Sequence, residues 1–258
     1  MTASSSVPQS LEDAIELAKQ ATLEALDTGY GRLQIEIVVP EIALRAEAIA
    51  REFVGLFEDE YGTALKVVFP DAGAAALARR NWGDLSCRVV DLGSRVTPVE
   101  KKVAEEDRIF LLVCPSAVEI QKVEKLCNLA GDRPVILLIP QLEDVSIVGI
   151  GYAARQLRDR FLSTLESIFY LQPMEGAALY RCFPAPWQVW REETEGGALE
   201  LLVERAEKPI GEALDRILNP VSVANATATD AAQDTTTKAK KNSGLLGELQ
   251  KFLRALSS

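Results

Sequence analysis

The chain has 258 residues, of which 48% are hydrophobic and 26% are charged, a composition typical of a globular protein with a substantial core. Its formal net charge of -10 argues against binding of nucleic acid, which requires a basic face, and against general adhesion to an anionic membrane. Histidine is absent, which excludes Ser-His-Asp and Cys-His catalysis and metal sites that contain imidazole.

The four cysteines show no C-x-x-C pairing and are Cys87, Cys114, Cys127 and Cys182. Cys114 follows an apolar strand and Cys127 lies on a predicted helix face, so both are interpreted as small core residues. No apolar run reaches the roughly 18 to 20 residues that span a bilayer, and the polar N-terminus does not resemble a secretory signal. We expect a soluble cytoplasmic protein in a reducing compartment.

Residues 11–27 repeat apolar positions with helical spacing, and Ser10 precedes them as a candidate N-cap. Residues 31–40 alternate partly and predict a strand, which a long helix from Glu41 to about Glu58 follows. Strands and helices then alternate, with strands predicted at 64–70, 86–92, 108–115 and 133–140 and helices at 71–82 and 116–130. This order predicts a mostly parallel, Rossmann-like α/β sheet with helices on both faces.

Four predicted strands end in proline, at Pro40, Pro70, Pro115 and Pro140. Proline stops a strand because it has no N–H for the ladder, so each one marks a carboxyl end. Open α/β sheets bind ligands at these ends. A phosphate-binding loop, however, needs glycine N–H groups there, and G-x-x-x-x-G-K-[ST] does not occur. We therefore expect neither ordinary nucleotide binding nor a cofactor.

Polar residues lie at or just beyond these strand ends: Asp71, Asp91, Ser116, Gln141 and Asp144. If they converge, they form a ligand crevice in which a carboxylate pair serves acid–base chemistry or binds Mg²⁺. The alternative is helix capping and turn formation, which Asp and Ser perform routinely. Ser116 and Glu119 have the spacing of a capping box.

After Pro140 we expect a loop or short strand and then a helix to about Leu165. Within this stretch Gly149-x-Gly151 lies too late in the chain for a dinucleotide fingerprint and is interpreted as a turn. Residues 167–206 predict four short strands with separators too short for helical crossovers, hence an antiparallel meander. A helix is expected to open at Pro209.

The resulting organisation is a single α/β domain at 8–220, followed by a linker and a terminal helix. The parallel part covers about 8–166, and the meander with its helix covers about 167–220. Residues 221–243 contain almost no large side chain and predict a disordered linker. Residues 244–258 predict an amphipathic helix.

The terminal helix places large apolar residues on one face, among them Leu249, Phe252, Leu253 and Leu256. Such a face binds the chain's own domain, a protein partner or a membrane surface, and the sequence leaves these three readings open.

Arg155 and Arg158 share a helix face, and Arg181 lies on a neighbouring strand. They form either a solvated face paired with acidic neighbours or a site for an anion or an acidic partner. Trp187 and Trp190 are three residues apart in a strand, so we expect one in the core and the other exposed at an edge, where aromatic residues anchor interfaces.

The segments LRDRFL at 157–162 and RCFPAPW at 181–187 carry a resemblance over roughly residues 8–220. The chain resembles a domain of unknown function from cyanobacteria and plastids, shared with the plant Low Photosystem II Accumulation 3 protein and with the C-terminal part of a chloroplast adenylate kinase. The resemblance implies a protein that helps photosystem II subunits accumulate near the thylakoid. It carries over no catalytic residue, and the kinase activity belongs to the other domain because no Walker motif is present.

Two functions follow as expectations. The first is a non-enzymatic accessory factor that contacts a photosystem or thylakoid protein, with peripheral membrane contact through the terminal helix and no nucleic acid. The second is a domain that binds a small phosphate or nucleotide-like metabolite at the strand ends, in a regulatory or cryptic enzymatic role.

Overall fold

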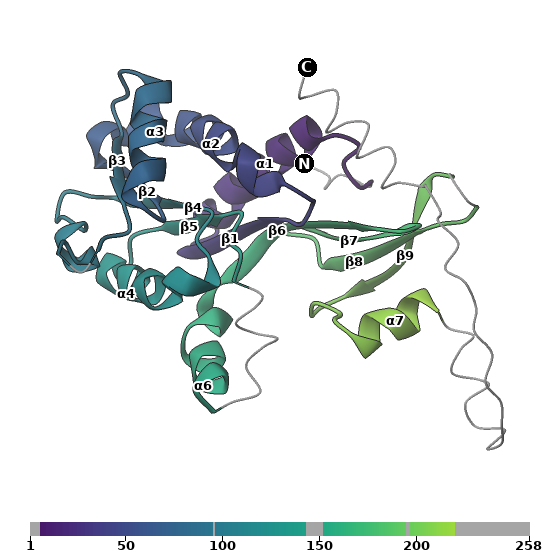
Figure 1. Ribbon diagram of the computed structural model, residues 1–258. Coiled ribbons are helices and arrows are strands. Elements are labelled where there is room, and N and C mark those ends of the chain that lie inside the picture. Colours follow the sequence, from purple (N-terminus) through teal and green to yellow (C-terminus); the bar gives the residue numbers. More distant parts are fainter. Residues whose placement is uncertain (1–5, 95, 143–151, 195–196, 220–258) are drawn as a thin grey trace. The chain divides into compact units, whose positions relative to one another are not determined.

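The computed structural model describes residues 6–94, 96–142, 152–194 and 197–219 (Figure 1). The predicted linker and terminal helix therefore lie outside the described residues, as do Asp144 and Gly149-x-Gly151. The chain divides into two compact units, one made of Ile15–Tyr170 and one made of Met1–Ala14 with Leu171–Ser258. Each unit is described by itself below.

The unit Ile15–Tyr170 contains alternating strands and helices. Its strands are β1 (Arg32–Ile37), β2 (Leu65–Phe69), β3 (Arg88–Asp91), β4 (Ile109–Val113) and β5 (Val135–Leu138). Its helices are most of α1 (Leu11–Asp27), then α2 (Ala46–Tyr61), α3 (Ala72–Trp82), α4 (Ile120–Ala130) and α6 (Tyr152–Arg160). Short 3-10 helices are η1 (Ile42–Arg45), η2 (Gly62–Ala64), η3 (Val99–Lys101), η4 (Ala117–Glu119) and η5 (Leu162–Thr164).

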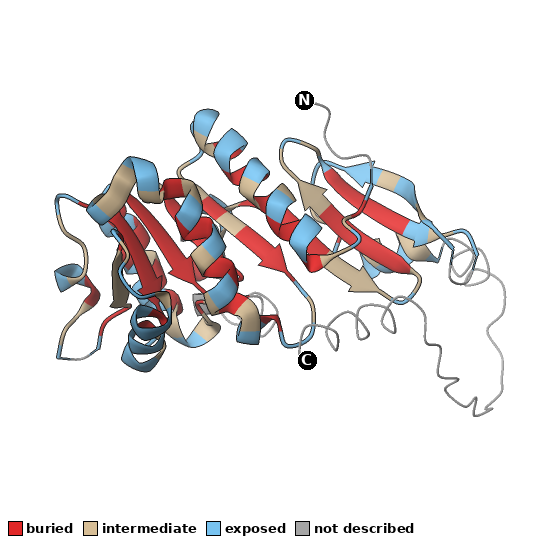
Figure 2. Cartoon of the chain, turned by 90° about the horizontal axis from the view of Figure 1, so that it is seen from above, coloured by how far each residue is buried: buried red, intermediate tan, exposed pale blue. Residues whose placement is uncertain are grey.

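The five strands of this unit pair in parallel in the order β3-β2-β4-β5-β1. Helices α2 and α3 cover one face, and α4 and α6 cover the other (Figure 1). Every residue of β2, β4 and β5 is buried, as a parallel sheet between two helical layers requires (Figure 2). The predicted parallel α/β sheet with helices on both faces is confirmed.

The helix caps follow from the local sequence. The Asp13 N–H donates to Ser10 Oγ at 3.0 Å, at the start of α1. Ser116 and Glu119 form the predicted capping box before α4. The helix expected from Glu41 begins differently, because Glu41 adopts the left-handed conformation with φ 60°. The chain first makes the 3-10 turn η1, and α2 starts only at Ala46.

The second unit contains the predicted antiparallel meander. Strands β7 (Ala177–Cys182), β8 (Trp187–Glu192) and β9 (Leu199–Arg205) pair antiparallel in that order. The pairing of β8 with β9 shifts register between Val189 and Trp190. Helix α7 (Glu212–Leu218) starts three residues after Pro209, because Gly211 with φ 51° breaks the chain direction before it.

Strand β6 (Glu166–Met174) begins in the first unit and ends in the second. By hydrogen-bond connectivity, the described strands form one sheet in the order β3-β2-β4-β5-β1-β6-β7-β8-β9. Among the described helices, none combines the length and the apolar content that a membrane span requires.

Candidate functional site

A pocket of about 280 Å³ opens at the carboxyl ends of the parallel neighbours β1 and β5. Two short segments line the pocket, one at the end of β1 and one at the end of β5. The first contributes Glu36, Ile37, Val38, Val39 and Ile42, and the second contributes Ile139, Pro140 and Gln141. Six of these side chains are apolar, one is a carboxylate and one is a carboxamide. The lining therefore has the mixed character of a small-molecule site.

The pocket lies at the carboxyl ends of two adjacent parallel strands, β5 and β1. Open α/β sheets bind ligands in crevices outside the carboxyl ends of their strands. The position of the pocket agrees with this rule.

Glu36 provides the carboxylate of the pocket. Its neighbour two residues back, Gln34, pairs with Leu137, a member of the core cluster that α4 covers. Because side chains alternate along a strand, Glu36 points to that same face. The side chain of Glu36 is buried, with only 7% of the residue exposed.

Two side chains donate hydrogen bonds to Glu36 Oε2. Ser167 Oγ on β6 lies at 2.6 Å, and Gln34 Nε2 lies at 3.1 Å. Burial of a carboxylate is unfavourable unless hydrogen-bond donors compensate for the lost hydration. These two hydrogen bonds provide that compensation for Glu36. The result is a fixed, buried carboxylate in a residue that lines the pocket.

The backbone around the pocket is strained. Among the described residues other than glycine, three have positive φ: Glu41 at 60°, Cys114 at 48° and Ile139 at 52°. Each adjoins a proline at a strand end, and a β-branched residue such as Ile139 rarely adopts this conformation. Such positions store about 1–3 kcal/mol each and persist only where neighbours enforce them.

Hydrogen bonds enforce the strained conformation at the end of β5. The Ile139 N–H donates to the Ile35 carbonyl at 2.8 Å, and the Gln141 N–H donates to the Pro115 carbonyl at 2.8 Å. The Cys114 N–H likewise donates to the Leu138 carbonyl at 2.8 Å. These contacts fix the lining of the pocket before any ligand binds.

Of the residues predicted to converge at the strand ends, Gln141 lines the pocket. The other described ones, Asp71, Asp91 and Ser116, make caps and turns, and Asp144 lies outside the described residues. Asp71 Oδ1 accepts from the N–H groups of Gly73 and Ala74 at the start of α3. Ser116 caps the turn before α4. The capping interpretation therefore describes Asp71 and Ser116.

Asp91 stabilises the loop after β3. Its carboxylate accepts from Lys102 Nζ at 2.7 Å and from the Gly93 N–H at 2.8 Å. Partial burial by itself raises the pKa of Asp91, but these hydrogen bonds outweigh it, so the pKa lies below its ordinary value. Asp91 is a charged anchor for the loop.

The predicted arginine cluster has several separate roles. Arg155 and Arg158 are exposed on α6. Arg160 forms a two-point ion pair with Glu124, from Nε at 2.6 Å and from Nη2 at 2.9 Å. These hydrogen bonds lower the pKa of Glu124. The guanidinium of Arg181 lies 5.4 Å from the ring centre of Trp187.

Trp187 and Trp190 correct one expectation. Both are buried, with 4% and 5% exposed, so no tryptophan of this strand stands exposed at an edge. All four residues from Trp187 to Trp190 are buried, so both faces of β8 are covered over this stretch. Trp190 Nε1 donates to Gln188 Oε1 at 3.1 Å, which satisfies its polar group within the protein.

The segment RCFPAPW forms the hairpin between β7 and β8. Lys208 Nζ lies 5.6 Å from the same Trp187 ring that Arg181 approaches, so two cations contact one indole. Arg181 and Trp187, at the two ends of the segment, therefore pack against each other.

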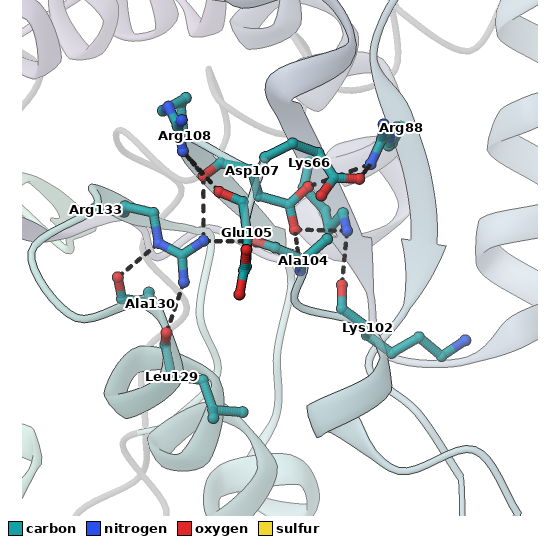
Figure 3. Close-up of polar contacts among 11 residues, drawn as sticks. Lys66, Arg88, Lys102, Ala104, Glu105, Asp107, Arg108, Leu129, Ala130 and Arg133 are labelled. Atoms are coloured by element: carbon teal, nitrogen blue, oxygen red, sulfur yellow. Dashed lines mark hydrogen bonds and ion pairs between the residues drawn. The ribbon is translucent and has the colours of Figure 1, made fainter.

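A second polar cluster lies at the amino ends of the parallel strands (Figure 3). Lys66 Nζ and Asp107 Oδ2 are 2.6 Å apart, with side chains 7% and 0% exposed. Lys66 also donates to the Lys102 carbonyl at 2.7 Å, and Asp107 accepts from the Ala104 N–H at 2.7 Å. Arg88 Nη1 lies 3.8 Å from the second carboxylate oxygen. This buried ion pair links the loop before β4 to strand β2.

Arg133, which lies just before β5, belongs to the same cluster and links the start of this strand to neighbouring segments. Its guanidinium donates to four backbone carbonyls: Leu129 at 2.7 Å, Ala130 at 2.8 Å, Ala104 at 2.8 Å and Asp107 at 3.1 Å. Two of these carbonyls, those of Leu129 and Ala130, belong to the last turn of α4. Carbonyls in the last turn of a helix have no N–H donor within the helix, so Arg133 supplies the donors. This cluster is structural.

The cysteines are not activated. Burial raises the pKa of Cys127 to about 12 and that of Cys87 to about 11. Burial also raises the pKa of Cys114. All four cysteines are free thiols. Within the described ranges, no group of three or more His, Cys, Asp or Glu side chains is placed to hold a metal ion.

Sequence reasoning missed Glu36 and Ser167. A signal for Glu36 was present, because Arg32, Gln34 and Glu36 alternate with three apolar residues in a strand of a sheet covered on both faces. Such a strand normally reads as continuously apolar, so a polar row in it indicates a special site. For Ser167 no signal existed, because its contact with Glu36 joins residues 131 positions apart.

The fold and the pocket together define an α/β protein whose parallel sheet carries a small pocket, with a buried glutamate among its lining residues, at the carboxyl ends of β1 and β5. Residues 8–216 match the family described as Domain of unknown function (DUF1995), so the chain belongs to this family. No solved structure matches the chain.

Proposed function

We propose that the protein is a non-enzymatic accessory factor that helps photosystem II subunits accumulate, through contact with a protein partner near the thylakoid. Membership of the DUF1995 family is consistent with this proposal. The resemblance to the Low Photosystem II Accumulation 3 protein, carried by the segments 157–162 and 181–187, gives it its direction. The likeness to the domain behind a chloroplast adenylate kinase adds no kinase role, since no Walker motif is present in the sequence.

The observation that carries the proposal is an apolar edge, formed by Val38, Leu44, Val96 and Val118. Three of them are very exposed, at 79% for Leu44, 87% for Val96 and 88% for Val118. All four follow the carboxyl end of a parallel strand, namely β1, β3 or β4. Single exposed apolar residues are ordinary, but several along one edge mark an interaction surface.

The spacing of the apolar edge suits a protein partner. Strands β3, β4 and β1 are first, third and fifth in the parallel part of the sheet. Neighbouring strands lie about 4.8 Å apart, so the edge extends over roughly 20 Å. A row of this length is longer than a small metabolite and suits a protein partner.

A charge-introducing double variant tests the proposal. Leu44→Glu with Val118→Glu places two carboxylates on the apolar edge and leaves the core untouched, since both residues are exposed. The matched control is Leu129→Glu, which charges an exposed leucine on α4. Tagged full-length chains are expressed in photosynthetic cells, and the photosystem II subunits that co-purify with each are quantified.

We expect recovery of photosystem II subunits to fall about tenfold for the double variant and to stay unchanged for the control, because charge in a desolvated interface is strongly unfavourable. Equal recovery from the wild type and the double variant would refute the apolar edge as the docking surface. Deletion of 221–258 in a separate arm shows whether the predicted terminal helix contributes.

The pocket supports a second candidate function, the binding of a small metabolite. The specific observation is the buried residue Glu36 in the lining of a pocket at the carboxyl ends of β1 and β5. A thermal-shift screen of the full chain against phosphates, nucleotides, amines and Mg²⁺ tests it, because a ligand that binds only the folded state raises the Tm. No shift with any compound would remove the support for this function.

A further inference from the structure

The pocket at the ends of β1 and β5 accepts hydrogen bonds more readily than it donates them. Pro140 has no N–H. The N–H groups of Ile139 and Gln141 are already bonded to backbone carbonyls at 2.8 Å, and that of Ile42 is directed to the Val39 carbonyl at 3.4 Å. Half of the lining residues therefore offer the pocket no backbone donor.

Its charge is negative. Glu36 contributes a carboxylate, and no lysine or arginine is among the lining residues that the structure describes. In a partly buried site, where the effective dielectric is lower than that of water, this carboxylate disfavours a phosphate or carboxylate ligand and favours a cation. The chemistry is thus the reverse of a phosphate cradle.

The remaining lining is apolar. Ile37, Val39, Ile42 and Ile139 surround the polar wall, and they suit a hydrocarbon body attached to the charged group. The volume of about 280 Å³ lies at the lower end of the range for ligand pockets, so the ligand is small.

We propose that this pocket binds a small organic cation, a primary ammonium carried on a short hydrocarbon chain. The ammonium group has three N–H donors, which the Glu36 carboxylate and the Gln141 side-chain oxygen accept. The hydrocarbon chain lies against Ile42 and Ile139. This inference rests on the second candidate function, ligand binding at the strand ends, and it replaces the phosphate-like ligand expected from the sequence.

The proposal distinguishes ligands by charge and by donors. The probe is n-pentylamine, and three comparison compounds change one property each. Sodium n-pentanoate keeps the hydrocarbon chain and inverts the charge, n-pentyltrimethylammonium keeps the charge and removes every N–H, and inorganic phosphate represents the anion expected from the sequence. Titrations of the full chain at millimolar concentrations, the range for so small a ligand, are followed by ¹⁵N-resolved NMR and by Tm.

We expect n-pentylamine to shift the amide signals of Val39, Ile139 and Gln141 and to raise the Tm. Glu36→Gln is expected to weaken its binding at least tenfold, because a charge-assisted contact becomes neutral. Gln141→Lys, at an exposed position, is expected to weaken it about threefold through like-charge repulsion, and it keeps the test valid if Glu36→Gln fails to fold. The matched control Asp71→Asn removes a carboxylate at another strand end, outside the pocket, and leaves binding unchanged.

The possible results distinguish failure of the ammonium proposal from failure of ligand binding at the strand ends. Binding of phosphate or pentanoate at these amides, with no response to n-pentylamine, overturns the ammonium assignment and leaves ligand binding intact. Equal binding of the trimethylated compound refutes the role of the N–H donors. No response to any of the four probes refutes both the inference and the pocket as a ligand site.

Discussion

Removal of one partner from the Lys66–Asp107 ion pair is expected to destabilise the parallel sheet strongly. The perturbation is Lys66→Met, which keeps the length of the buried side chain and deletes its charge. Asp107, with a fully buried side chain, then keeps only the Ala104 N–H at 2.7 Å and the distant Arg88 at 3.8 Å (Figure 3). A buried carboxylate without its counter-ion is the main source of the loss.

The magnitude follows from this geometry. Breaking a fully buried pair from one side lowers the free energy of unfolding by about 3–5 kcal/mol. We expect the lower end, about 3 kcal/mol, because Asp107 retains one N–H donor and one remote cation. Urea unfolding of the full chain, followed by far-UV circular dichroism, measures the change through the midpoint and the slope.

Two further variants control the measurement. Lys66→Met with Asp107→Asn neutralises both partners, and we expect it to lose less than Lys66→Met alone, because no uncompensated charge stays buried. Lys125→Met breaks the ion pair between Lys125 and Glu100, whose side chains are about half exposed, and is expected to change the free energy of unfolding little, because solvent screens an exposed pair. The reasoning is refuted if Lys66→Met loses no more than Lys125→Met, or if the double variant is the less stable of the two Lys66 variants.

Three other predictions concern the loop after β3, an ion pair and a thiol. Gly93→Ala is expected to lower the free energy of unfolding by about 1–3 kcal/mol in urea, because φ is 91° and a Cβ would lie 2.7 Å from the Thr97 carbonyl. Arg160 lowers the folded-state pKa of Glu124, so this stability is present at neutral pH and is lost as the pH falls. Arg160→Gln should therefore flatten the fall of the free energy of unfolding between neutral pH and about pH 3. Cys127, with its pKa raised to about 12, should react with a thiol reagent only after unfolding, as mass spectrometry of labelled peptides can show.

Most elements of the parallel sheet were predictable because their signals are local. A strand covered by helices on both faces must be continuously apolar, and the sequences of β4 and β5 are. The helix caps were equally local, since Ser116 and Glu119 lie within one turn of each other. Where a strained residue intervenes, as Glu41 does with φ 60°, the helix boundary moved by several residues.

The burial of Trp187 and Trp190 was not predictable in the same way. Alternation along a strand gives the two faces, but it does not say whether each face is covered. All four residues from Trp187 to Trp190 are buried, so both faces of β8 are covered there. Which segments cover a face is a long-range property, and the spacing of two tryptophans carries no information about it.

The pocket shows how one sequence feature supports two conclusions. The prolines at the strand ends excluded a phosphate-binding loop because they lack an N–H. The structure places left-handed residues beside three of them, Glu41, Cys114 and Ile139, and Ile139 lines the pocket. Strain there lowers stability, as does the burial of the Glu36 carboxylate, and a sequence selected for stability alone has no reason to combine both at one point. Their coincidence at the carboxyl ends of adjacent parallel strands is therefore the strongest argument that this end of β1 and β5 binds a ligand, and the donor-poor backbone that proline creates is the reason to expect a cation there.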